Sequence, residues 1–160
     1  MKEPKNKLYI PEWHGAILYD SGKYELFFAK YHEDDKSWKA KIKKIGNNTK
    51  TLYTDGIILC AWVLFQNLNN VVLIHAQGKA NLLQLLIPIC NLSRENAKQE
   101  PKKIHLCTAN PYAIVKDDRR TTYKSVMSDI LGKSIKIQEH SISESKQIFI
   151  RKDVVYTWDE

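Results

Sequence analysis

The chain has 160 residues, of which 43% are hydrophobic and 27% charged, and its formal net charge is +7. A chain of this length is typical of one domain that buries a core without disulfides or a structural metal, and its six glycines and five prolines exclude a collagen-like or low-complexity protein. No apolar stretch reaches about 18 residues and residues 1–5 lack the apolar region of a secretory signal, so we expect an intracellular protein, cytoplasmic or nuclear, without membrane contact.

The first fifty residues predict three strands, over 15–19, 23–31 and 36–45. Asp20-Ser21-Gly22 and Glu33-Asp34-Asp35 are turn signals between them, and Gly46-Asn47-Asn48 ends the third. Short strands joined by tight turns favour an antiparallel meander.

The remaining residues alternate between strand and helix patterns. Strands are expected over 51–58, 59–65, 71–75, 103–108, 134–139 and 147–156. A leucine-rich helical stripe begins at Gly78, and Pro88 should kink or end that helix because proline has no N–H for the carbonyl four residues back. A second helix is expected over about 119–131, capped by Asp117 or Asp118 and stopped by Gly132.

This order predicts a single mixed α/β domain, with a mostly antiparallel mixed sheet covered by two helices. Within it we expect an N-terminal β-meander (1–50), a core (51–145) and a C-terminal strand (146–160). The three cysteines, Cys60, Cys90 and Cys107, are an odd number in apolar runs without C-x-x-C spacing. They predict buried free thiols in a reducing compartment, and no zinc site or other cofactor.

One short motif, Thr51-Leu52-Tyr53-Thr54-Asp55-Gly56, resembles the opening of ribonuclease H domains of retroelement reverse transcriptases. The resemblance extends over roughly residues 51–145 through the order of a hairpin (61–75), a helix from Lys79, a strand (104–108), a helix and a last strand followed by a histidine. It implies a ribonuclease H-like fold, with Asp55 as a metal-binding residue and His140 as a second catalytic candidate. The alternative interpretation of the motif is an Asp-Gly turn between two strands.

Two positions depart from the family pattern. Gln84 stands where the family's helix has a metal-binding glutamate, and Ala109 stands where its next strand ends in an aspartate. Hydrolysis by two Mg²⁺ ions requires several convergent carboxylates, because hard cations need charged oxygen ligands. The resemblance therefore implies a ribonuclease H-like domain without its chemistry.

The basic residues offer two candidate phosphate-binding sets. Trp38, Ala40 and Ile42 alternate with lysines, which predicts Lys39, Lys41 and Lys43 on one exposed strand face, followed by Lys44. Lysines that protect an edge strand from aggregation give the same pattern. The second set lies at the start of the second predicted helix and consists of Lys116, Arg119, Arg120 and Lys124.

Three other patterns carry weaker chemistry. Cys107 and His105 share one strand face, but two buried strand residues are the simpler interpretation. His75-Ala76-Gln77-Gly78-Lys79 is similar to a phosphate-cradling turn before a helix, with one glycine only. Glu33-Asp34-Asp35 is typical of a solvated turn.

We therefore predict a non-catalytic nucleic-acid-binding module that holds the phosphates of RNA or DNA through lysines, without reading bases. One alternative is a metal-dependent nuclease that uses Mg²⁺, in which Asp55 is joined by Asp20, Asp117 or Asp118. Another is a viral or mobile-element interaction factor whose basic surface meets an acidic protein. The sequence leaves the oligomeric state open.

Overall fold

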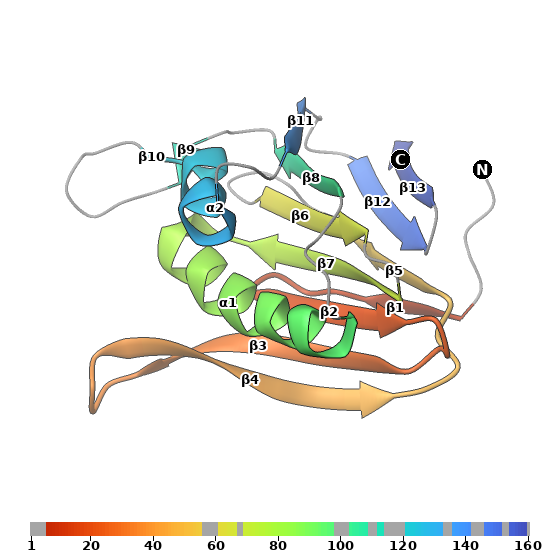
Figure 1. The fold of residues 1–160 in the computed structure, drawn as a ribbon, viewed down its shortest axis with the longest axis horizontal. Coiled ribbons are helices and arrows are strands. Elements are labelled where there is room, and N and C mark those ends of the chain that lie inside the picture. Colours follow the sequence, from red (N-terminus) through yellow and green to blue (C-terminus); the bar gives the residue numbers. More distant parts are fainter. Residues whose placement is uncertain are drawn as a thin grey trace.

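The computed structural model describes residues 6–55, 61–66, 69–97, 103–108, 112–113, 121–132, 136–141, 146–151 and 154–159. These residues form a mixed α/β fold made mostly of strands, in which a large sheet is packed against two helices (Figure 1). The strands are β1 (Lys7–Tyr9), β2 (His14–Tyr19), β3 (Tyr24–His32), β4 (Ser37–Gly46), β5 (Thr51–Thr54), β6 (Ala61–Gln66), β7 (Asn70–Ala76), β8 (Lys103–Thr108), β9 (Tyr112–Ala113), β10 (Thr121–Thr122), β11 (Ile137–Ser141), β12 (Lys146–Arg151) and β13 (Val154–Asp159). The helices are α1 (Gly78–Ala97) and α2 (Tyr123–Leu131).

The large sheet has seven described strands in the order β11-β8-β6-β7-β2-β3-β4. Its neighbours are antiparallel except β11 and β8, which are parallel. The predicted meander is confirmed, because β3 pairs with both β2 and β4. α1 lies across the antiparallel strands β7, β2, β3 and β4, and α2 packs against α1.

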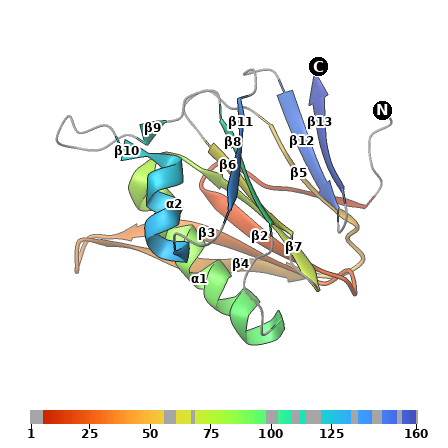
Figure 2. The same cartoon turned by 45° about the horizontal axis from the view of Figure 1, so that its top comes forward.

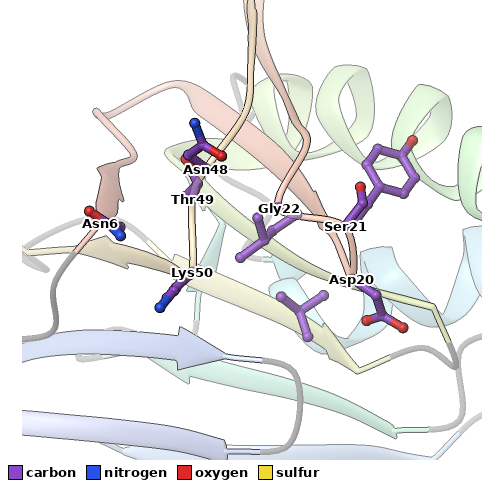
Figure 3. A pocket seen from close by; sticks show the side chains of 10 residues that line it. Asn6, Asp20, Ser21, Gly22, Asn48, Thr49 and Lys50 are labelled. Atoms are coloured by element: carbon purple, nitrogen blue, oxygen red, sulfur yellow. The ribbon is translucent and has the colours of Figure 1, made fainter.

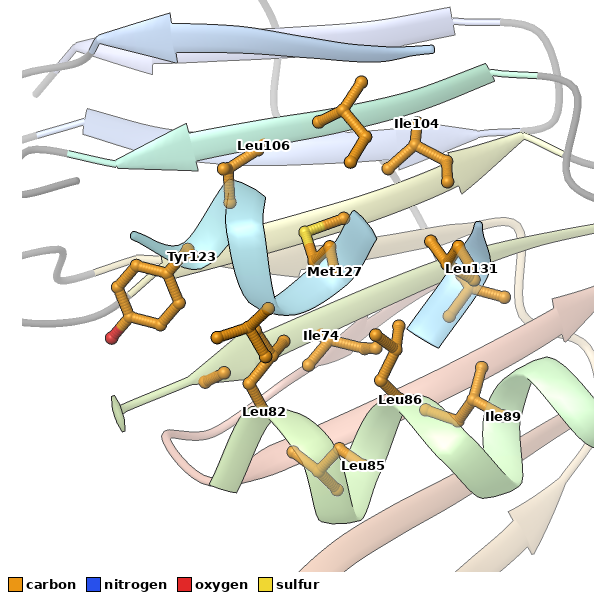
Figure 4. Packing of buried hydrophobic residues seen from close by; sticks show 14 of the residues in the cluster. Ile74, Leu82, Leu85, Leu86, Ile89, Ile104, Leu106, Tyr123, Met127 and Leu131 are labelled. Atoms are coloured by element: carbon orange, nitrogen blue, oxygen red, sulfur yellow. The ribbon is translucent and has the colours of Figure 1, made fainter. Parts of the chain in front are cut away.

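The helices and the large sheet enclose the first of two cores (Figure 4). Leu82, Leu85 and Ile89 are fully buried on α1, at the spacing that the leucine stripe predicts. They meet strand residues such as Ile74, which alternate toward the helices. Pro88 does not end α1, which continues to Ala97; burial of the leucine stripe offsets the one hydrogen bond that proline removes.

The second core lies on the other face of the large sheet, against a smaller sheet ordered β1-β5-β12-β13. Leu18, Leu73 and Cys107 of the large sheet pack there with Leu52 of β5. The molecule therefore has three layers, with the helices on one side of the large sheet and the smaller sheet on the other (Figure 2). The large sheet is buried on both faces over most of its width, which explains why β7 is apolar along nearly its whole length.

The expected ribonuclease H order is not shown. β5, which holds the Tyr-Thr-Asp motif, belongs to the smaller sheet, where it pairs with β1 and β12. Within the large sheet, β6 stands between β7 and β8. The motif and the strand at 103–108 are therefore not neighbours in one sheet.

Three boundaries differ from those expected. α2 begins at Tyr123, four residues later than predicted, because the Thr122 side chain accepts a hydrogen bond from the N–H of Ser125 and caps it. Gly132 ends α2 as predicted. His140 lies inside β11, not after it, because the parallel pairing with β8 continues to Ser141. The single C-terminal strand predicted over 147–156 is a hairpin of β12 and β13.

Among the described residues, no helix combines the length and the apolar character that crossing a lipid bilayer requires.

Candidate functional site

Asp55 directly follows β5 and is half-buried. The hydroxyl of Tyr9 donates a hydrogen bond of 2.7 Å to its Oδ1 atom. Burial, together with this carboxylate, raises the pKa of Tyr9 to about 12. The phenol therefore stays protonated over the physiological range and keeps donating to Asp55.

The structure does not bring the ribonuclease H positions together. Asp55 belongs to the layer of the smaller sheet, whereas Gln84 lies on α1 across the large sheet. Asp20 lies in the turn after β2. Ala109, Asp117 and Asp118 fall outside the described residues. In the described part of the chain no three His, Cys, Asp or Glu side chains form a group that could hold a metal ion.

His140 is paired with a second histidine. Its Nε2 atom lies 2.9 Å from Nδ1 of His105, and the two rings stack with centroids 5.1 Å apart. One of these two nitrogens donates and the other accepts, so a hydrogen bond joins β8 and β11 through their side chains. Cys107, on the same strand as His105, is buried, and burial raises the pKa of its thiol to about 12. A thiol that is so hard to ionise cannot serve as a nucleophile, which leaves Cys107 as a core residue.

The lysines of β4 do not follow strict alternation. The pairing of β3 with β4 shifts between Leu26 and Phe27, so Lys41 is opposite Phe28 while Lys44 is opposite Leu26. Because Leu26 and Phe28 point to the same side of β3, Lys41 and Lys44 share a face that the sequence assigned to Lys41 and Lys43. Lys39 pairs with Lys30 on that same face. We call Lys30, Lys39, Lys41, Lys43 and Lys44 the basic face.

Two members of the basic face have partners within the protein. Lys39 forms an ion pair of 2.8 Å with Asp35, and this pair together with a hydrogen bond from Ser37 lowers the pKa of Asp35 to about 2. Nζ of Lys43 lies 3.2 Å from Nε2 of His14. Burial and the Lys43 charge lower the pKa of His14, so the imidazole is neutral and accepts from the ammonium group.

The basic face lies at a sheet edge, because β4 is the outermost described strand of the large sheet. Ile42 and Ile45 on this strand are 50% and 57% exposed. In the second basic set, Lys124 is exposed on α2, and Lys116, Arg119 and Arg120 fall outside the described residues. Trp38 is half-buried at the start of β4 and packs against the helix-side core.

Sequence analysis missed a buried polar link between the two sheets. Nδ1 of His75, in β7, lies 2.8 Å from Oγ1 of Thr54, in β5. The Thr54 hydroxyl donates its only proton to the carbonyl of Ile10, at 2.7 Å. Thr54 can therefore only accept from His75, so the proton of the neutral imidazole lies on Nδ1 and its basic lone pair lies on Nε2.

Burial lowers the pKa of His75 to about 4, although the nearby carboxylates of Glu12 and Asp55 favour its charged form. The imidazole is thus neutral and held in one tautomer at pH 7. Thr54 stands within the ribonuclease H-like motif and His75 at the end of a predicted strand, but no spacing in the sequence indicates that β5 and β7 face each other. Only the packing of two sheets brings these side chains together.

The turn before α1 does not present its N–H groups to a ligand. The N–H of Gln77 donates to Oδ1 of Asn81, at 3.0 Å, and the N–H of Gly78 donates to the hydroxyl of Tyr123, at 2.8 Å. The first of these hydrogen bonds caps the start of α1, and the second joins it to α2. The predicted similarity to a phosphate-cradling turn is therefore wrong for these two groups.

A surface pocket of about 450 Å³ lies at the opposite end of β2 and β7 from His75. Leu18 and Val71 are its apolar residues, and Asp20 and Lys50 lie on opposite sides of it (Figure 3). Neither the basic face nor His75 contributes to its lining.

Comparison with protein-family models and with curated protein sequences finds no significant match to this chain.

Proposed function

We propose that this protein binds nucleic acid through the basic face of β3 and β4. The observation that carries the proposal is the register shift at Leu26 and Phe27, which places Lys41 and Lys44 on the same exposed face as the Lys30–Lys39 pair. The register shift thereby adds Lys44 to the lysines that β3 and β4 present on one face, instead of leaving it on the opposite face. The proposal does not require the ribonuclease H order.

The spacing of these lysines suits a phosphate backbone. Alternate residues of a strand lie about 7 Å apart, which is close to the separation of successive phosphates in an extended strand. A net charge of +7 adds a long-range attraction for polyanions. Ion pairing with Asp35 makes Lys39 a weaker contributor than Lys41 and Lys44.

Binding of fluorescent RNA and DNA, single-stranded and duplex, should be measured by anisotropy over a range of salt. We expect the logarithm of the affinity to fall linearly with the logarithm of the salt concentration, since each phosphate contact releases counterions. Lys41→Glu and Lys44→Glu should each weaken binding and flatten that slope. The matched control is Lys136→Glu, the same charge change at the exposed residue before β11, on the opposite edge of the large sheet.

Equal losses in all three variants would overturn the assignment of this face. Retention of an acidic protein with no affinity for nucleic acid would favour the interaction-factor alternative. Cleavage of the probe in Mg²⁺, abolished by Asp55→Asn, would favour the nuclease alternative.

A further inference from the structure

Three aromatic side chains form a continuous row at the end of the β3–β4 hairpin. The ring of Trp38 contacts Trp13 on one side, with centroids 5.1 Å apart, and Tyr31 on the other, at 5.5 Å. Both contacts are tilted, by 56° and 54°. Tyr31 ends the row toward solvent and is 43% exposed.

The inner end of the row is held in place by an unusual backbone. Trp13 has a φ of 70°, a left-handed conformation that costs a bulky residue free energy. Its N–H donates to the carbonyl of His75, at 3.0 Å, and its indole N–H donates to Oε1 of Gln77, at 2.8 Å. These two bonds fix the indole against Trp38, so the row is rigid before any ligand arrives.

Two lysines follow the exposed end of the aromatic row along the hairpin, on its opposite face. Tyr31 pairs with Trp38 across the hairpin, and the next pair along the two strands is Lys30 with Lys39. Successive residues point to opposite faces, so the rings and the ammonium groups lie on either side of the same two strands. Since β4 is the outermost described strand and the hairpin projects beyond α1 (Figures 1 and 2), a ligand can follow its edge from one side to the other.

We infer that the preferred ligand is single-stranded nucleic acid, with a base stacked on Tyr31 and the neighbouring phosphates on Lys30 and Lys41. This inference rests on the proposed function and names its substrate class. The bases of a duplex are stacked on one another and cannot reach an exposed ring, whereas an unpaired base has a free face. Stacking on aromatic rings beside a basic surface is how proteins hold single strands without reading their sequence.

Affinities for a single strand and for the matching duplex should be measured with Tyr31→Ala, with Tyr31→Phe as the matched variant that keeps the ring. We expect Tyr31→Ala to weaken single-strand binding about tenfold and to leave duplex binding unchanged. Tyr31→Phe should bind like the parent chain. Tyr9→Ala, which removes an exposed ring from β1, is the control for loss of an aromatic elsewhere.

Tryptophan fluorescence gives an independent readout, because a base on this row should quench Trp38. The quenching by a single strand should be smaller in Trp38→Phe than in the parent chain.

If single strand and duplex bind equally, with Lys41→Glu weakening both and Tyr31→Ala neither, the stacking inference is wrong and the proposed function stands. If no nucleic acid binds at all, both fail.

Discussion

His75 in the large sheet and Thr54 in the smaller sheet are joined by a buried hydrogen bond of 2.8 Å. The Thr54 hydroxyl in turn donates a hydrogen bond to the carbonyl of Ile10, so these two hydrogen bonds connect three segments of the polypeptide. This link lies between two apolar layers, where an unsatisfied polar atom costs more free energy than at the surface. It therefore contributes to the pH dependence of stability and to the contact between the two sheets.

Acidification should destabilise the protein through His75. Its pKa in the folded state is about 4, below the ordinary value of 6.5. The unfolded chain therefore binds a proton between pH 6.5 and 4 while the folded chain does not, so the free energy of unfolding falls as pH falls through that window. We expect a loss of about 2 kcal/mol between pH 7 and pH 5, measured by urea denaturation.

The control for this pH effect is His75→Gln, in which that part of the pH dependence should disappear whatever the stability of the variant at pH 7. An unchanged slope in His75→Gln would assign the effect to other groups.

Removing the Thr54 hydroxyl should be costly. Thr54→Val leaves the Nδ1–H of His75 and the Ile10 carbonyl without their buried partner, which we expect to lower the free energy of unfolding by about 2 kcal/mol. Thr51, on the same strand, offers the matched control. Its Oγ1 is buried without a hydrogen-bond partner in the described part of the structure, so Thr51→Val should be neutral or stabilising.

Both valine variants are measured by chemical denaturation, and Thr54→Ser should recover most of the loss. Equal effects of the two valine substitutions would show that strand packing, and not the hydrogen bond, determines the loss of stability in Thr54→Val.

Gly15 of β2 lies against Ile89 of α1. A Cβ atom there would lie 2.8 Å from Cδ1 of Ile89, too close for two carbon atoms. Gly15→Ala should therefore lower the free energy of unfolding by about 1–3 kcal/mol. Ile89→Val removes that methyl group and alone should cost about 1 kcal/mol.

A double-mutant cycle by thermal or urea denaturation tests the contact between Gly15 and Ile89. The double variant should be clearly more stable than the sum of the two single effects predicts. Additive effects would place the strain of Gly15→Ala elsewhere.

Cys107 should resist alkylation in the folded protein. With its pKa raised to about 12 by burial, the thiolate fraction at pH 8 falls about 1000-fold below that of an ordinary cysteine. Peptide mapping by mass spectrometry after brief iodoacetamide treatment should find its peptide unmodified in buffer and modified in urea. Comparable rates in the two conditions would mean that this part of the second core opens readily.

Local patterns in the sequence predict much of the secondary structure. The antiparallel meander follows from short alternating strands separated by Asp20-Ser21-Gly22 and Glu33-Asp34-Asp35, and β8 has the bounds that its pattern predicts. The buried stripe of α1 follows from its leucine spacing. These features depend on residues within a few positions of one another, so they can be predicted from the local sequence pattern.

The misplaced features each depend on a distant partner. The ribonuclease H-like order implies one sheet for the motif strand and the later strands, but β5 pairs with β1 and β12, whose residues lie 40 or more positions away in either direction. The place of Lys44 beside Lys41 on the basic face results from a register shift that alternation cannot reveal. The end of β11 is likewise set by its pairing with β8, more than 30 residues earlier in the chain.

The sequence alone determined the class of the fold, the apolar helix stripe and the basic character of the third meander strand, because hydrophobic periodicity and charge act locally. Tertiary structure decided that the strands divide into two sheets, that Lys41 and Lys44 share a face, and that His75 meets Thr54. These relationships depend on which distant strands pair and stack, and burial between the sheets then sets the protonation of the imidazole.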